Sequence, residues 1–125
     1  GMTDMAWHTL TEPFEGDVEQ FEAVSMAPTQ VLPVVPGTAM APAFGHIFSG
    51  GYAAGYYGYK WAEVLEADAF SLFKEKGIFN REAASSFREN VLSKGGTEHP
   101  MELYVRFRGH KPETRALIEK MGLGK

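Results

Sequence analysis

Residues 52–76 read YAAGYYGYKWAEVLEADAFSLFKEK, and this stretch decides the fold class. Its apolar residues recur at helical spacing, and Gly77 follows in the position of a C-cap, so we expect one long helix here. At about 100° per residue, Tyr52, Tyr56 and Tyr59 fall within about 60° of one another. The opposite face carries further large groups, namely Tyr57, Trp61, Val64, Leu65 and Leu72. A helix with large side chains on both faces is expected inside a bigger assembly.

Shorter helices are expected on both sides of this long one, because glycines, prolines and capping residues divide the rest of the chain into short apolar-periodic segments. Thr3 and Asp4 are expected to cap the first helix, Asp17 the second and Asn80 the one after the long helix. No alternating segment of useful length occurs. The sequence therefore predicts an all-α fold, with about five or six helices around one long central helix.

Length and composition limit the classes of protein to which this chain can belong. The chain has 125 residues, and we expect residues 2–125 to form a single helical domain, with Gly1 as the remnant of a cleaved tag. A net charge of -4 argues against nucleic acid as a partner. The sequence contains no cysteine and no apolar run long enough to span a membrane. The cytoplasm is the expected compartment, with the periplasm as the alternative.

A histidine and two adjacent glycines precede the phenols of the long helix. His46 is followed by Gly50 and Gly51, a flexible pair that could carry the imidazole toward or away from the tyrosines. Histidine and phenol groups that converge on one point are neutral hydrogen-bond donors suited to an oxyanion. The alternative is that the tyrosines belong to the core, where their hydroxyls bond to backbone carbonyls. Periodicity alone favours that alternative.

Several long segments resemble the thimet-oligopeptidase type of zinc metallopeptidase, most closely its peptidyl-dipeptidase and oligopeptidase A branch. The central one is AFGHIFSGGYAAGYYGYKWAEVLEADAF, at residues 43–70. The resemblance continues through FRENVLSKGG, ELYVRFRGHKPE and LIEKMGL, and upstream through TDMAWHTL and VLPVVPGTAMAPAF. It covers essentially the whole chain.

The resemblance implies roles for individual residues. His46 matches the family histidine near the scissile bond, and Tyr52 and Tyr59 match the tyrosines that bind substrate and stabilise the oxyanion. Tyr56 matches a further phenol of the substrate cleft, and Gly50 and Gly51 match hinge glycines that belong to the substrate-binding segment.

The family's metal site is expected elsewhere. The resemblance implies a helical, zincin-type enzyme in which an H-E-x-x-H motif and a later glutamate hold zinc, and this sequence contains no H-E-x-x-H. We therefore expect the chain to be the C-terminal fragment of such an enzyme, with no metal ligand and no cofactor of its own. The isolated chain is expected to be inactive.

Two functional hypotheses follow. The first hypothesis is that the chain is part of a zinc-dependent oligopeptidase that hydrolyses short peptides. In it, this chain supplies the side of the active site that carries His46 and the tyrosines, which binds substrate and stabilises the oxyanion. The expected partners are short peptides and the missing N-terminal catalytic part. The second is a non-enzymatic helical module that binds peptides or a partner protein. Apolar surfaces left by a missing part favour association, so a homodimer is expected under the second hypothesis.

Overall fold

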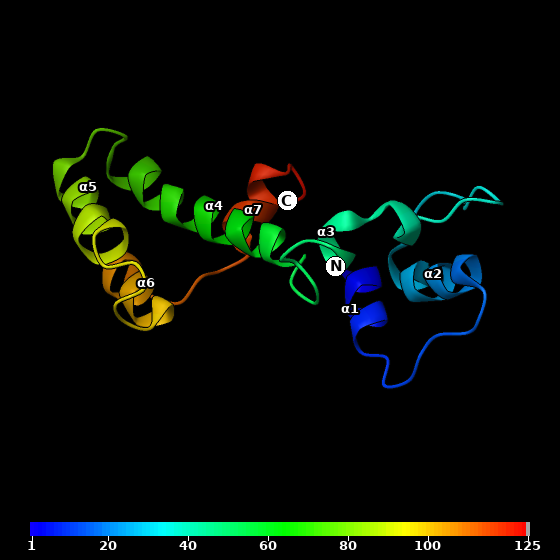
Figure 1. Ribbon diagram of the computed structural model, residues 1–125. Helices are drawn as coiled ribbons and strands as arrows, with labels where there is room; N and C mark the ends of the chain where they lie inside the picture. Colours follow the sequence, from blue (N-terminus) through cyan, green and yellow to red (C-terminus); the bar gives the residue numbers. More distant parts are fainter. Residues whose placement is uncertain (125) are drawn as a thin grey trace. The chain divides into compact units, whose positions relative to one another are not determined.

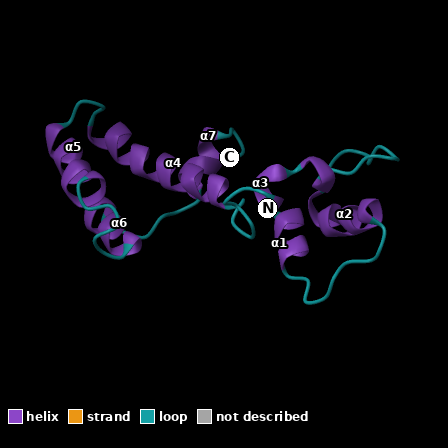
Figure 2. Cartoon of the chain, in the orientation of Figure 1, coloured by secondary structure: helices purple, strands orange, loops and turns teal. Residues whose placement is uncertain are grey.

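The computed structural model describes residues 1–124, and within them the chain is helical, with turns and loops but no strand (Figure 1, Figure 2). The all-α prediction is confirmed. The α-helices are α1 (Met2–His8), α2 (Val18–Met26), α3 (Gly45–Phe48), α4 (Gly58–Lys76), α5 (Arg81–Phe87), α6 (Pro100–Arg108) and α7 (Arg115–Lys120). Three further short helical segments are η1 (Ala27–Thr29), η2 (Ala41–Ala43) and η3 (Arg88–Leu92), of which η3 is a π-helix.

Local capping signals place several helix ends. The Asp17 carboxylate accepts a hydrogen bond from the Gln20 backbone N–H at 2.8 Å, and Asn80 accepts one from Ala83 at 2.9 Å. Gly77 follows α4 with φ +106°, a conformation that costs little only for glycine. The caps predicted at residues 17, 77 and 80 are therefore confirmed.

Two predicted boundaries are wrong. Thr3 and Asp4 both lie inside α1, which begins at Met2, so neither caps it. The Asp4 carboxylate instead accepts from backbone amides about 50 residues away. The long helix begins at Gly58, and residues 51–57 form successive turns. Glycine at positions 51, 55 and 58 lowers helix stability there, so the turns prevail over a longer helix.

The described chain divides into two compact units, Gly1–Gly58 and the part from Tyr59 onward, and each is described by itself. The expectation of a single domain over residues 2–125 stays a prediction. In the described residues no helix is both long and apolar enough to cross a membrane.

An aromatic cluster holds the first unit together. Trp7 of α1 packs against Phe21 of α2 with ring centroids 4.2 Å apart, and Phe14 lies 5.0 Å from Trp7. The next contact joins α1 to α3, because the Trp7 and Phe48 rings are 6.0 Å apart. Contacts between such large rings are a main source of stabilisation in a small unit.

The second unit is built on α4. Leu72, Ala83 and Phe107 are buried together, which brings α4, α5 and α6 into one core. A buried carboxylate also joins α4 to α6, since the Tyr104 hydroxyl donates to Asp68 at 2.6 Å. Arg108 Nε lies 3.8 Å from the other oxygen of the same carboxylate and donates to the Asp68 carbonyl at 3.1 Å.

Candidate functional site

The helix that carries His46 is short, and its neighbours fix it in place. Ile47 is fully buried, whereas His46 is exposed. Phe48, two residues after His46, lies 6.0 Å from Trp7 and 5.6 Å from His8 between ring centroids. The apolar side of α3 therefore faces α1, and the imidazole of His46 is left accessible.

The turns after α3 bring the phenols back toward that imidazole. The Tyr52 N–H donates to the His46 carbonyl at 3.3 Å, and the Gly55 N–H donates to the Tyr52 carbonyl at 2.9 Å. A side chain at Gly50 would meet the His46 carbonyl oxygen at 3.0 Å and its Cα at 3.3 Å. Glycine at position 50 thus permits the close return of the chain.

Three ring systems converge on His46. Its imidazole lies 5.9 Å from the Tyr52 ring and 6.0 Å from the Tyr56 ring, measured between centroids. Phe44 supports the group with an edge-on contact of 4.8 Å to Tyr56. The side chains of His46 and Tyr52 are exposed and that of Tyr56 is half-buried. The arrangement presents an imidazole and two phenols, which are hydrogen-bond donors for a bound polar group.

The first unit therefore brings together His46, Tyr52 and Tyr56, three of the predicted site residues. The two tyrosines lie on successive turns, whereas the sequence predicted that they lie on one face of a helix. Tyr59 lies in the first turn of α4, is 46% exposed and belongs to the second unit. Its role beside His46 stays a prediction, as does the role of Gly51 as a hinge.

Asp4 is the residue of this region that sequence reasoning missed. It is fully buried, and its two carboxylate oxygens accept hydrogen bonds of 2.9 Å from the backbone N–H groups of Ala54 and Tyr56. Nδ1 of His8 lies 2.9 Å from one of these oxygens and 2.8 Å from the Asp4 carbonyl. Burial raises the pKa of Asp4, but the Tyr56 and Ala54 amides and the nearby His8 lower it by more, so the net pKa lies below its usual value. The spacing of Asp4 and His8 by one helical turn was the only signal in the sequence.

The residues that the structure describes do not form a zinc site among themselves. Within residues 1–124 no three histidine, aspartate or glutamate side chains are grouped so that they could hold a metal ion. His46 is surrounded by Phe44, Tyr52 and Tyr56, and phenol and phenyl rings are not the usual ligands of zinc. No chemical step is therefore assigned to a metal held by these residues.

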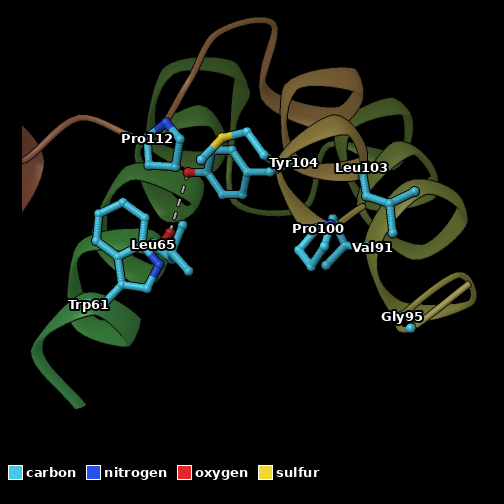
Figure 3. Close-up of a pocket in the computed structure, with 10 residues that line it drawn as sticks. Trp61, Leu65, Val91, Gly95, Pro100, Leu103, Tyr104 and Pro112 are labelled. Carbon is cyan, nitrogen blue, oxygen red and sulfur yellow. Dashed lines mark hydrogen bonds between the residues drawn. The ribbon is translucent and has the colours of Figure 1, made fainter. Parts of the chain in front are cut away.

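The second unit has a separate apolar hollow of about 240 Å³ between α4 and α6. Figure 3 shows Trp61 and Leu65 on one side of the hollow. The Tyr104 hydroxyl points toward Leu65, whose carbonyl oxygen lies 3.4 Å from it. A neighbouring hollow of about 400 Å³ shares Leu65, Val91 and Tyr104. Both are lined almost wholly by apolar groups, so they suit an apolar occupant better than a peptide bond.

Comparison with known proteins identifies what the chain is similar to. The profile of Peptidase family M3 matches residues 1–123. Oligopeptidase A of Escherichia coli (strain K12) is 47% identical over 126 aligned positions, which cover 98% of this chain and 18% of that protein. Oligopeptidase A of Haemophilus influenzae is 57% identical over 86 positions, 68% of this chain and 13% of that protein.

A relative with a different name is similar over the same span. Dipeptidyl carboxypeptidase of Escherichia coli (strain K12) is 40% identical over 124 positions, which cover 98% of this chain and 18% of that protein. The chain thus spans less than a fifth of the length of these curated relatives.

Proposed function

The chain belongs to peptidase family M3, and we propose that it is the C-terminal part of a zinc-dependent oligopeptidase that hydrolyses short peptides. Its relatives bear the names of oligopeptidases and of a dipeptidyl carboxypeptidase. In this proposal the chain supplies the substrate-binding and oxyanion-stabilising wall of the active site. The observation that carries it is the convergence of His46, Tyr52 and Tyr56 on one exposed surface.

The proposed chemistry of this wall is hydrogen bonding to the peptide. When water adds to a peptide carbonyl, negative charge develops on its oxygen, and a phenol O–H or imidazole N–H pointing at that oxygen lowers the barrier. His46, Tyr52 and Tyr59 are the proposed donors in this role, and Tyr56 with Gly50 and Gly51 contacts the substrate. One such donor is typically worth about 3 kcal/mol of barrier.

The metal and the general base are proposed to lie in the remainder of the domain, because the residues described here do not fit a zinc site. The missing N-terminal catalytic part is then the partner of this chain. Large apolar side chains that are exposed here, such as Val31, Leu32 and Phe79, support a partner surface, since their exposure fractions are 92%, 74% and 96%. The cytoplasm is the proposed compartment.

Two experiments test the proposal. The coding sequence immediately upstream should contain an in-frame H-E-x-x-H, and its absence from the gene would sink the proposal. The purified 125-residue chain should hydrolyse no peptide with or without added zinc. Turnover by the chain alone that a chelator abolishes would show that the chain holds its own metal.

The second candidate function is a non-enzymatic helical module that binds a peptide or protein. The observation that favours it is the pair of apolar hollows on the second unit. This candidate predicts a homodimer in solution, with Trp61 and Leu65 in the interface. Light scattering that shows a monodisperse monomer counts against it.

A further inference from the structure

Asp4 ties the start of the chain to the turns that carry the phenols. One carboxylate oxygen accepts from Ala54 N and the other from Tyr56 N, both at 2.9 Å, and the side chain has no exposed surface. A buried carboxylate is costly unless it is paired and hydrogen-bonded, and bonds to an ionised acceptor are stronger than neutral ones. Both oxygens of this group are used on a single turn.

The turn held by Asp4 contains a strained residue. Ala54 has φ +54°, and in the described part of the chain it is the one residue other than glycine with a positive φ. Side chains with a Cβ avoid this left-handed conformation, which persists only where the surroundings enforce it. The Asp4 bonds at residues 54 and 56 flank Gly55, so they hold the chain on both sides of the bend.

The same helix also holds His46. His8 and Trp7 pack on Phe48, two residues after His46, and Nδ1 of His8 contacts the Asp4 carboxylate. One helix, α1, thus contacts both the helix with the imidazole and the turn with Tyr56.

We propose that Asp4 is a positioning residue, which holds Ala54 in the left-handed conformation and thereby sets the distance between the His46 and Tyr56 rings. Its use in peptide hydrolysis rests on the function proposed above, whereas its action on the turn does not. His8 orients the carboxylate from the next turn of α1.

Nuclear magnetic resonance of the 125-residue chain tests the action on the turn. Asp4→Asn keeps the shape of the side chain but leaves only one oxygen, that of the amide, to accept from the Ala54 and Tyr56 N–H groups. Hydrogen exchange at residue 54 or 56 should quicken by at least about tenfold, the factor for one hydrogen bond to a charged acceptor. The nuclear Overhauser contact between the His46 and Tyr56 rings should weaken. Unchanged exchange at both amides with the contact retained would overturn the proposal.

Glu22 offers a matched control in the same unit. It is also a buried carboxylate whose two oxygens accept from two backbone amides, those of Met40 at 2.7 Å and Ala41. Glu22→Gln should quicken exchange at residues 40 and 41 and leave residues 54 and 56 unchanged. Equal effects of both variants at residue 54 would show general loosening of the unit and overturn the specific role of Asp4.

A double variant decides the case in which Asp4→Asn unfolds the first unit. Glycine adopts a positive φ without strain, so Asp4→Asn with Ala54→Gly should recover the contact between the His46 and Tyr56 rings. If the contact stays absent, Asp4 does not act through residue 54 and the proposal is overturned.

Kinetics separate this proposal from the proposed function. In the peptidase domain that contains this chain, Asp4→Asn should lower kcat by about 10- to 100-fold, the scale of a small misplacement, with a smaller change in KM. If the unaltered domain hydrolyses no peptide, the proposed function fails. The magnetic resonance data then still test whether Asp4 holds the turn at residues 54–56. If the domain is active and Asp4→Asn changes only KM, the positioning role fails while the function stands.

Discussion

Replacing Ala54 by glycine should stabilise the first unit, against the usual effect of a new glycine. Ala54 has φ +54° and its side chain is exposed, so the change relieves strain and removes no buried contact. The left-handed conformation costs a residue with a Cβ about 1–2 kcal/mol. Glycine costs about 0.4–1 kcal/mol through the greater freedom of the unfolded chain. The difference is a gain of up to about 1.6 kcal/mol, centred near about 0.8 kcal/mol, in the free energy of unfolding.

The neighbouring alanine gives the matched control. Ala53 is also exposed but does not have a positive φ. Ala53→Gly therefore increases the conformational entropy of the unfolded chain and relieves no strain. It should lower the free energy of unfolding by about 0.4–1 kcal/mol. Two adjacent, chemically identical substitutions are thus expected to differ in sign.

Urea unfolding followed by tryptophan fluorescence measures both variants. A Trp61→Phe background leaves Trp7 as the single tryptophan, so the signal reports on the first unit. If Ala54→Gly destabilises as much as Ala53→Gly, residue 54 is not left-handed in solution, and the reasoning about the turn is refuted.

Two further predictions concern the buried carboxylates. Folding lowers the pKa of Asp4, so its ionised carboxylate stabilises the fold above the ordinary pKa of 3.8, and this stabilisation is lost as pH falls below 3.8 toward the folded pKa. The free energy of unfolding should therefore fall less steeply with decreasing pH in Asp4→Asn than in the unaltered chain. Equal steepness in the two proteins would contradict this. Tyr104→Phe removes the donor to Asp68 and should cost about 1.5–3 kcal/mol in urea unfolding, whereas a cost below 0.5 kcal/mol, roughly that of a surface change, would show that the bond contributes little.

Local chemistry explains which parts of the fold could be predicted. The caps at Asp17 and Asn80 depend on groups three residues away, and the sequence placed both correctly. The pairing of Arg108 with Asp68 could not be read from the sequence, because it depends on how α6 packs on α4.

The site shows where such reasoning stops. The prediction that Tyr52 and Tyr56 lie on one helix face was wrong, because residues 51–57 form turns, although both rings do lie near His46. Periodicity takes no account of the combined loss of helix stability caused by several glycines. Asp4 was misread as a cap, because its partners lie 50 and 52 residues along the chain and no local pattern marks them.

The central claim is that this chain supplies hydrogen-bond donors to the transition state of peptide hydrolysis, and a single kinetic comparison tests it most directly. Tyr59→Phe and Tyr57→Phe are made in the peptidase domain that contains the chain, and kcat and KM are measured with a short peptide. Both tyrosines are exposed, and Tyr57 was predicted to face away from the site, so it serves as the control.

We expect Tyr59→Phe to lower kcat by about 10²- to 10³-fold, the usual loss for one oxyanion donor, with a smaller change in KM. Tyr57→Phe should leave both constants within about twofold, the effect of a change of 0.4 kcal/mol in barrier. A rise in KM alone for Tyr59→Phe, or an equal loss of kcat in both variants, would contradict the account.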